Sequence, residues 1–86
     1  MSEKETPKTR EEILTMSLEA RVQEVMHYQI NIDNYSIALQ KISEMEPSEQ
    51  VEMTEFAKQL RDLLASEKLE QKKAKLMLAV LEQQVG

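Results

Sequence analysis

The residues of this chain that could do chemistry are carboxylates, lysines and one histidine, and their spacing matches no catalytic motif. The sequence contains no cysteine, which excludes thiolate metal sites and thiol nucleophiles. No HExxH, Walker or Gly-x-Ser-x-Gly pattern occurs. His27 could act as a lone ligand or a pH-sensing group, but a solvated surface histidine is the simpler interpretation. We therefore expect a protein that is not an enzyme and has neither a cofactor nor a metal site.

Five glutamates cluster in the middle of the chain, with no basic residue between Lys41 and Lys58. We call this group the acidic turn, and it consists of Glu44, Glu46, Glu49, Glu52 and Glu55. Acidic side chains suit the start of a helix, but Glu44 and Glu46 would lie at the end of one, against its dipole. This placement leads to the hypothesis that the acidic turn binds a basic surface on a partner protein.

A second group of charges, in the last third of the chain, consists of Lys68, Lys72, Lys73 and Lys75. These lysines could contact nucleic acid or anionic lipid. They are interleaved with Glu67, Glu70 and Gln71, however, which is more typical of a solvated helix face with ion pairs. The net charge of −5 also makes general nucleic-acid binding improbable.

The composition is that of a small helical protein. Eighty-six residues make at most one domain, and a chain this short buries only a modest fraction of its surface. Charged residues make up 31% of the chain, and the remainder is rich in helix formers. The sequence has no apolar stretch of the signal-peptide type and no run of about 18 apolar residues. We therefore expect a cytoplasmic protein without membrane contact.

Capping signals place the first helix. Residues 1–8 contain no apolar side chain after the first residue, which predicts a flexible tail ahead of a single domain over residues 9–86. Thr9 and Glu12 have the spacing of a capping box. No proline or glycine follows for more than thirty residues, which predicts a helix over about residues 10–46.

The second helix is placed by a proline. The residue before Pro47 is pushed out of the α region, which predicts a turn over about residues 46–48. Pro47 or Ser48 would then start a helix, because both residue types favour its first positions. This helix would run over about residues 48–85, with Gly86 as its C-terminal cap.

The apolar residues of the two helices match as an antiparallel pair. Facing residues in such a hairpin have position numbers that add up to a constant. The predicted facing residues of the first helix are Ile42, Leu39, Tyr35, Ile32, Tyr28, Val25, Arg21, Leu18 and Leu14. Those of the second helix, in matching order, are Met53, Phe56, Leu60, Leu63, Glu67, Glu70, Ala74, Met77 and Leu81. The constant puts the fold point between Pro47 and Ser48, which predicts a coiled-coil-like hairpin.

Residues 28–39 also alternate as a β-hairpin does, with Asp33 and Asn34 at its turn. An isolated ribbon of two strands is marginal in water, and this turn lacks the glycine that such hairpins favour. The helical pattern continues through these residues without interruption, so we predict a helix.

Three of the facing positions are charged, namely Arg21, Glu67 and Glu70, and they lie in adjacent layers. A shared polar layer would lower stability while fixing the register of the helices. The alternative is that Arg21 extends to the rim and the helices separate there.

Apolar residues outside the helix pairing predict a binding surface. Some face away on the first helix, and others form a stripe on the second helix that is interrupted at Gln71. The predicted partner-binding residues are Met26, Ile30, Ile37, Leu64, Leu76, Leu78, Val80 and Val85. Soluble monomers seldom leave such residues in contiguous contact with water. The simplest partner is a second copy, which would give a homodimeric four-helix bundle, although a helix of another protein could fill the same groove.

From these features we expect a non-catalytic protein–protein interaction module, such as a small adaptor, inhibitor or chaperone-like subunit, that acts by helix packing and self-association. The alternative is a regulator of nucleic-acid machinery that acts through an acidic, DNA-mimicking surface or through the basic patch at Lys68–Lys75. A net charge of −5 is low for a DNA mimic, so the first hypothesis is favoured.

Overall fold

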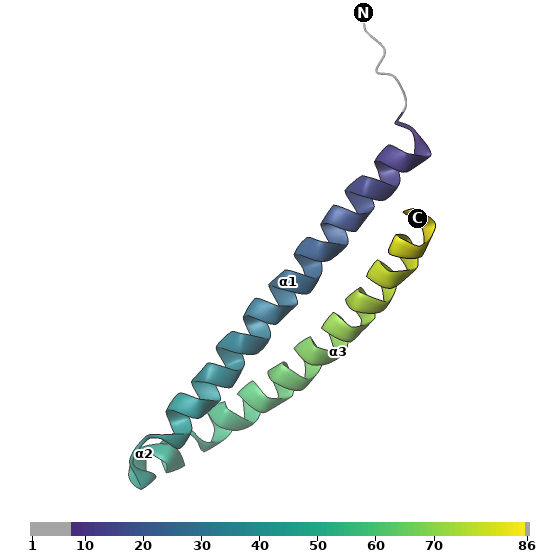
Figure 1. Ribbon diagram of the computed structural model, residues 1–86. Helices are drawn as coiled ribbons and strands as arrows, with labels where there is room; N and C mark the ends of the chain where they lie inside the picture. The colour runs from purple at the N-terminus through teal and green to yellow at the C-terminus, as the bar shows by residue number, and fades with distance from the viewer. Residues whose placement is uncertain (1–7, 86) are drawn as a thin grey trace, which may run out of the picture.

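A computed structural model describes residues 8–85 of the chain, which form three helices (Figure 1). Helix α1 spans Arg10–Ser43, α2 spans Pro47–Glu52 and α3 spans Thr54–Val85. The two long helices run antiparallel, and α2 closes the hairpin at one end (Figure 1). The predicted all-α hairpin is thus confirmed, including the helix through residues 28–39. Residues 1–7 of the predicted tail and the predicted cap Gly86 lie outside the described residues.

The predicted capping box starts α1. The backbone N–H of Glu12 donates to Thr9 Oγ1 at 3.1 Å, and the backbone N–H of Thr9 donates to Glu12 Oε1 at 2.9 Å. These bonds satisfy two N–H groups that have no partner within the helix. The hydrogen bonds from Thr9 also favour the charged carboxylate and lower the pKa of Glu12.

The turn begins earlier than predicted, because α1 ends at Ser43 rather than near residue 46. Gln50 makes the early ending possible. Its Nε2 donates to the backbone carbonyls of Met45, at 2.7 Å, and Ser43, at 3.2 Å, which lie beyond the end of the helix ladder. Pro47 then occupies the first position of α2, where a missing N–H costs nothing.

The predicted second helix is divided in two at Met53. The backbone N–H of Met53 is shared between the carbonyls of Glu49 and Gln50, both at 3.1 Å, so the first segment ends there. The Met53 side chain packs against the most buried cluster of the hairpin. This break lets α2 bend across the end of the hairpin while α3 stays alongside α1 (Figure 1).

The hairpin is a single layer of helices with a thin core. Its extents are 67 × 33 × 15 Å and its radius of gyration is 20.0 Å, whereas a compact domain of this length has about 12 Å. The buried cluster lies at the turn end and consists of Ile42, Ala57 and Leu60. Within residues 8–85 no helix is long and apolar enough to cross a membrane. A layer this thin cannot enclose a large side chain, and none of the described ones is fully buried.

The side of α3 that faces α1 is rotated slightly from the prediction. At alternate predicted positions, the residue that faces α1 is the next one along the chain. Phe56, Leu63 and Met77, predicted to face α1, are exposed. The residues that follow them take their place: Ala57 is buried, and Leu64 and Leu78 are half-buried. The other predicted positions after the turn do face α1. We call the set of facing residues on both sides of the hairpin the seam.

Two features of the sequence explain this rotation. At the turn end, Ala57 allows α3 to approach the buried Ile42, whereas the large ring of Phe56 would hold the helices apart. In the middle of the helix, the rotation buries the neutral amide of Gln71 instead of the carboxylate of Glu70. Burying an amide that keeps its hydrogen bonds costs far less than burying an unpaired charge.

We predict that acid weakens the start of α1. The lowered pKa of Glu12 contributes stability above its unfolded value, near 4.5, and this contribution is lost as the pH falls through the lower folded value. Amide exchange in the first turn should therefore speed up over that range, which an NMR titration can follow. Glu12→Gln should remove the response, and the control Glu11→Gln should keep it. A Glu12 pKa at or above 4.5 would contradict the prediction.

Candidate functional site

The middle of the seam is polar and is organised around Gln71, which is only 7% exposed. Its Nε2 donates to the backbone carbonyl of Val25 at 3.2 Å and to Oε1 of Gln29 at 2.9 Å. Gln29 in turn donates through Nε2 to Oδ1 of Asp33 at 2.9 Å. The chain of bonds links α3 to α1 at one level, so a slip of either helix along the other would break it.

A second polar contact crosses the seam on the turn side of Gln71. Asn31 Nδ2 donates to Oε1 of Glu67 at 3.1 Å. The ring of Tyr28 is half-buried nearby. Burial raises the pKa of the Tyr28 hydroxyl, and the carboxylates of Glu24, Glu70 and Glu67 raise it further. The hydroxyl therefore stays protonated and neutral among these acids.

The predicted polar layer forms in part. Arg21 and Glu67 face the other helix, but Arg21 pairs within its own helix, with Nη1 2.8 Å from Oε1 of Glu24. Glu70 lies at the edge of the seam and also pairs locally, with Oε2 3.1 Å from Nζ of Lys73. Within residues 8–85 these are the two ion pairs. The bonds that cross the seam come instead from amides, which the predicted layer did not include.

The two sides of the hairpin differ in character. On α3, Phe56, Leu63 and Met77 lie to one side of the layer. Each of them comes one position before a seam residue of that helix. Met77 lines a groove of about 430 Å³ together with Ser17, Ala20 and Glu24 of α1, which places these residues on the same side. Helical spacing adds two exposed apolar residues to this side, because Ile13 lies seven positions before Ala20 and Val80 lies three positions after Met77. We call it the apolar face, and its members are Ile13, Phe56, Leu63, Met77 and Val80. Five more exposed apolar residues lie on the outer edges of the two helices, because each falls midway between two seam residues and so points away from the other helix: Met16, Ile30 and Ile37 on α1, and Leu69 and Leu76 on α3.

The opposite side carries a row of basic residues on α3. Arg61 lines a groove with Leu39 and Thr54 on that side. Residues three, four or seven positions apart continue the row along the helix. We call it the basic face, and it consists of Lys58, Arg61, Lys68, Lys72 and Lys75, all exposed. Lys73 does not belong to it, because its spacing from Met77 and Val80 places it on the apolar side.

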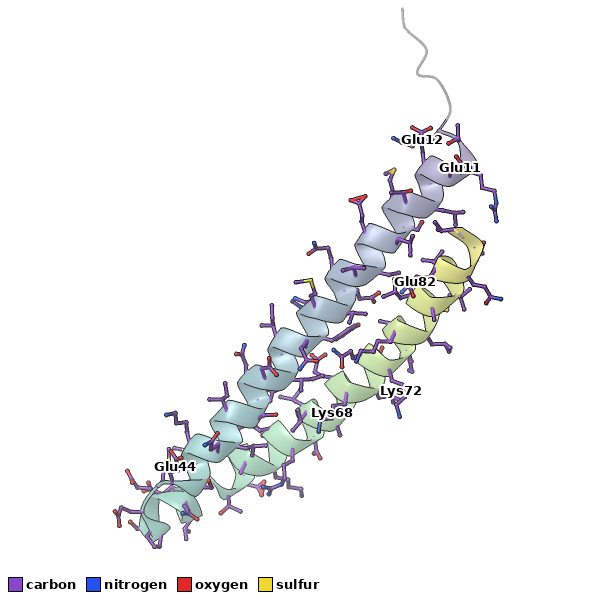
Figure 2. The ribbon with its side chains drawn as sticks, viewed as in Figure 1. Glu11, Glu12, Glu44, Lys68, Lys72 and Glu82 are labelled. Atoms are coloured by element: carbon purple, nitrogen blue, oxygen red, sulfur yellow. The ribbon has the colours of Figure 1, made fainter. Side chains whose placement is uncertain are left out.

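The acidic turn is exposed throughout, and Figure 2 shows Glu44 at the closed end of the hairpin. The predicted position of Glu46 at the end of a helix is wrong. Glu46 forms the N-cap of α2, where its N–H donates to Oε1 of Glu49 at 3.3 Å and an acid is favourable. Glu44 alone remains at the carboxyl end of α1, as the C-cap.

The structure divides the predicted partner-binding residues. Leu64 and Leu78 are half-buried in the seam and so lie within the hairpin itself. Val80 is exposed on the apolar face, whereas Ile30, Ile37 and Leu76 are exposed on the outer edges of their helices. Met26 is exposed on the side of Gln29, toward the basic face, and Val85 lies at the open end, beside Arg10 and Leu14.

His27 is exposed and packs its ring edge-on against Tyr28, with the centroids 6.4 Å apart. Within residues 8–85 no three His, Asp or Glu side chains are grouped so that they could hold a metal ion.

Gln29, Asn31 and Gln71 take part in the hydrogen bonds across the seam, and sequence reasoning did not predict them there. One signal was available for Gln71, since it is the polar member of a stripe whose other members are Ala57, Leu64, Leu78 and Val85. A single polar residue in an apolar heptad stripe is typical of a position that sets register. Gln29 and Asn31 carry no such signal, because each lies on the helix surface until its partner is known.

The chain matches no protein-family model, and comparisons with curated proteins and with solved structures found no match.

We predict that Gln71→Ala destabilises the hairpin by about 1–2 kcal/mol, because two hydrogen bonds across the seam are lost and polar groups are left without them. Chemical denaturation at a fixed protein concentration measures the change. Gln59→Ala is the matched control, since Gln59 is an exposed glutamine of the same helix. Equal stability of the two variants would contradict a structural role for Gln71.

Proposed function

We propose that the chain is a non-catalytic protein–protein interaction module, a small adaptor, inhibitor or chaperone-like subunit, that acts by helix packing and self-association. The observation that carries this proposal is the apolar face. Two helices in one layer can cover only one stripe of each other. Five large apolar residues on one side remain 40–51% exposed, and five more are 52–65% exposed along the outer edges of the helices. Soluble monomers seldom leave so many large apolar side chains in contact with water.

A second copy is the simplest cover for this face. Two layers stacked on each other form a four-helix bundle, in which side chains exposed in the hairpin become the core. Each large apolar side chain that is fully buried stabilises the assembly by about 1.5–3 kcal/mol, so a few contacts suffice to offset the cost of association. The hydrogen bonds of the side-chain amides in the seam would hold the two helices in register and so fix the positions of the side chains on the apolar face.

We predict that the chain is a homodimer in solution. Sedimentation equilibrium over a wide range of concentration should give about twice the chain mass of 10.0 kDa, with dissociation on dilution. A mass that stays at 10.0 kDa up to high concentration would contradict self-association.

A second candidate function, regulation of nucleic-acid machinery, is favoured by the basic face. Its five basic residues lie in one row along α3, and the row holds no acidic residue from Thr54 to Ala79. Such a row can neutralise phosphates, but the net charge of −5 opposes it at long range.

For this second candidate, the expected result is weak, salt-sensitive binding of a labelled DNA duplex in fluorescence anisotropy. Lys68→Glu should weaken the binding several-fold, since it reverses a charge within the row. Lys41→Glu, on α1, is the control and should have a smaller effect. Absence of binding at low salt would exclude this function for the basic face.

A further inference from the structure

We propose that the apolar face binds a second copy of the chain, with the two hairpins stacked face to face and their turns at opposite ends. The twofold axis would cross α3 between Glu70 and Lys73. This inference rests on the proposed self-association and specifies the surface, the orientation and the register of the dimer.

Charge selects the face. When two hairpins stack with their turns at opposite ends, so that α3 lies on α3, the basic face would meet its own copy with Arg61, Lys68 and Lys75 close to the same groups, and like charges in an interface are repulsive. On the apolar face, the charges near the middle of α3 are one acid and one base, Glu70 and Lys73. A dimer through the apolar face also leaves both basic faces in water, on the outside of the bundle.

The acidic turn selects the orientation. Two hairpins with their turns at the same end would bring both acidic turns together, with Lys41 and Lys58 as the nearest bases. With the turns at opposite ends, each acidic turn lies beside the open end of the other copy. That end carries Glu11, Glu12 and Glu82 together with Arg10, and Figure 2 shows the three acids there, far from Glu44. The repulsion between ends is then smaller.

The order of residues along α3 selects the register. Stacking with the turns at opposite ends places α3 on α3 in antiparallel directions. An axis midway between Glu70 and Lys73 puts Glu70 level with Lys73 of the second copy, and Leu63 level with Val80 of the second copy. The pairing of Glu70 with Lys73 and the pairing of Leu63 with Val80 therefore each occur twice, once on each side of the axis.

The Glu70–Lys73 pair is free to take on this role. Its side chains are 44% and 62% exposed, so the ion pair within α3 is weak and leaves both groups accessible. On α1, the same side carries the small residues Ser17 and Ala20 beside the groove. Small residues there let the second layer approach closely.

The test is a charge exchange between two variants. Glu70→Lys and Lys73→Glu each place like charges across the axis, so each variant alone should dimerise roughly tenfold more weakly than the natural chain. An equimolar mixture should recover the natural affinity, because a variant with two lysines at the axis would then face a variant with two glutamates there. Analytical ultracentrifugation with one variant labelled measures both effects.

Lys68→Glu is the matched control, since it reverses a charge one turn away on the basic face and should leave dimerisation nearly unchanged. Recovery on mixing supports the antiparallel apolar-face dimer. If the natural chain dimerises but the single variants dimerise equally well, or the mixture shows no recovery, this interface is wrong while self-association stands. If the natural chain is a monomer at every concentration, both proposals fail.

Discussion

Two helices packed in a single layer can hide only one stripe of each from water, and the other properties of this molecule depend on that limit. The layer has the 15 Å thickness of a helix pair, and no described side chain is enclosed on all sides. The hairpin must therefore either be polar on both faces or have one face covered. The basic face is polar and can stay in contact with water, whereas the apolar face needs a cover. Stability and association are for this reason expected to be linked.

Packing is graded along the hairpin. At the turn end, Ile42, Ala57 and Leu60 form a buried cluster, and Gln50 binds carbonyls just after the end of the α1 ladder. In the middle, amide side chains replace apolar contacts and fix the level at which the helices meet. At the open end, Leu14 and Leu81 are only half-buried, so local opening is expected to begin there. A second copy with its turn beside this open end would support the weakest part of each hairpin.

The hairpin could be predicted from the sequence because its signals are local and agree with one another. Thr9 and Glu12 mark the start of α1, Pro47 marks the turn, and the heptad spacing sets an antiparallel register. The rotation of α3 could not be predicted in the same way. Up to Leu78 the stripes at Phe56 and at Ala57 each hold three apolar residues and one polar residue. They differ only in the last turn, where Gln84 continues the first stripe and Val85 the second, so hydrophobicity separates them only weakly. The choice depends on how closely the backbones approach and on which polar group finds a partner across the seam.

The apolar face can be tested most directly by a methyl NMR dilution series on the natural chain. If a second copy covers this face, the methyl groups of Leu63, Met77 and Val80 should shift between dilute and concentrated samples. Those of Val22 and Met26, exposed toward the basic face, should stay constant. Shifts confined to Val22 and Met26, or no concentration dependence at any of these residues, would contradict the conclusion that the protein associates through the uncovered side of its single layer.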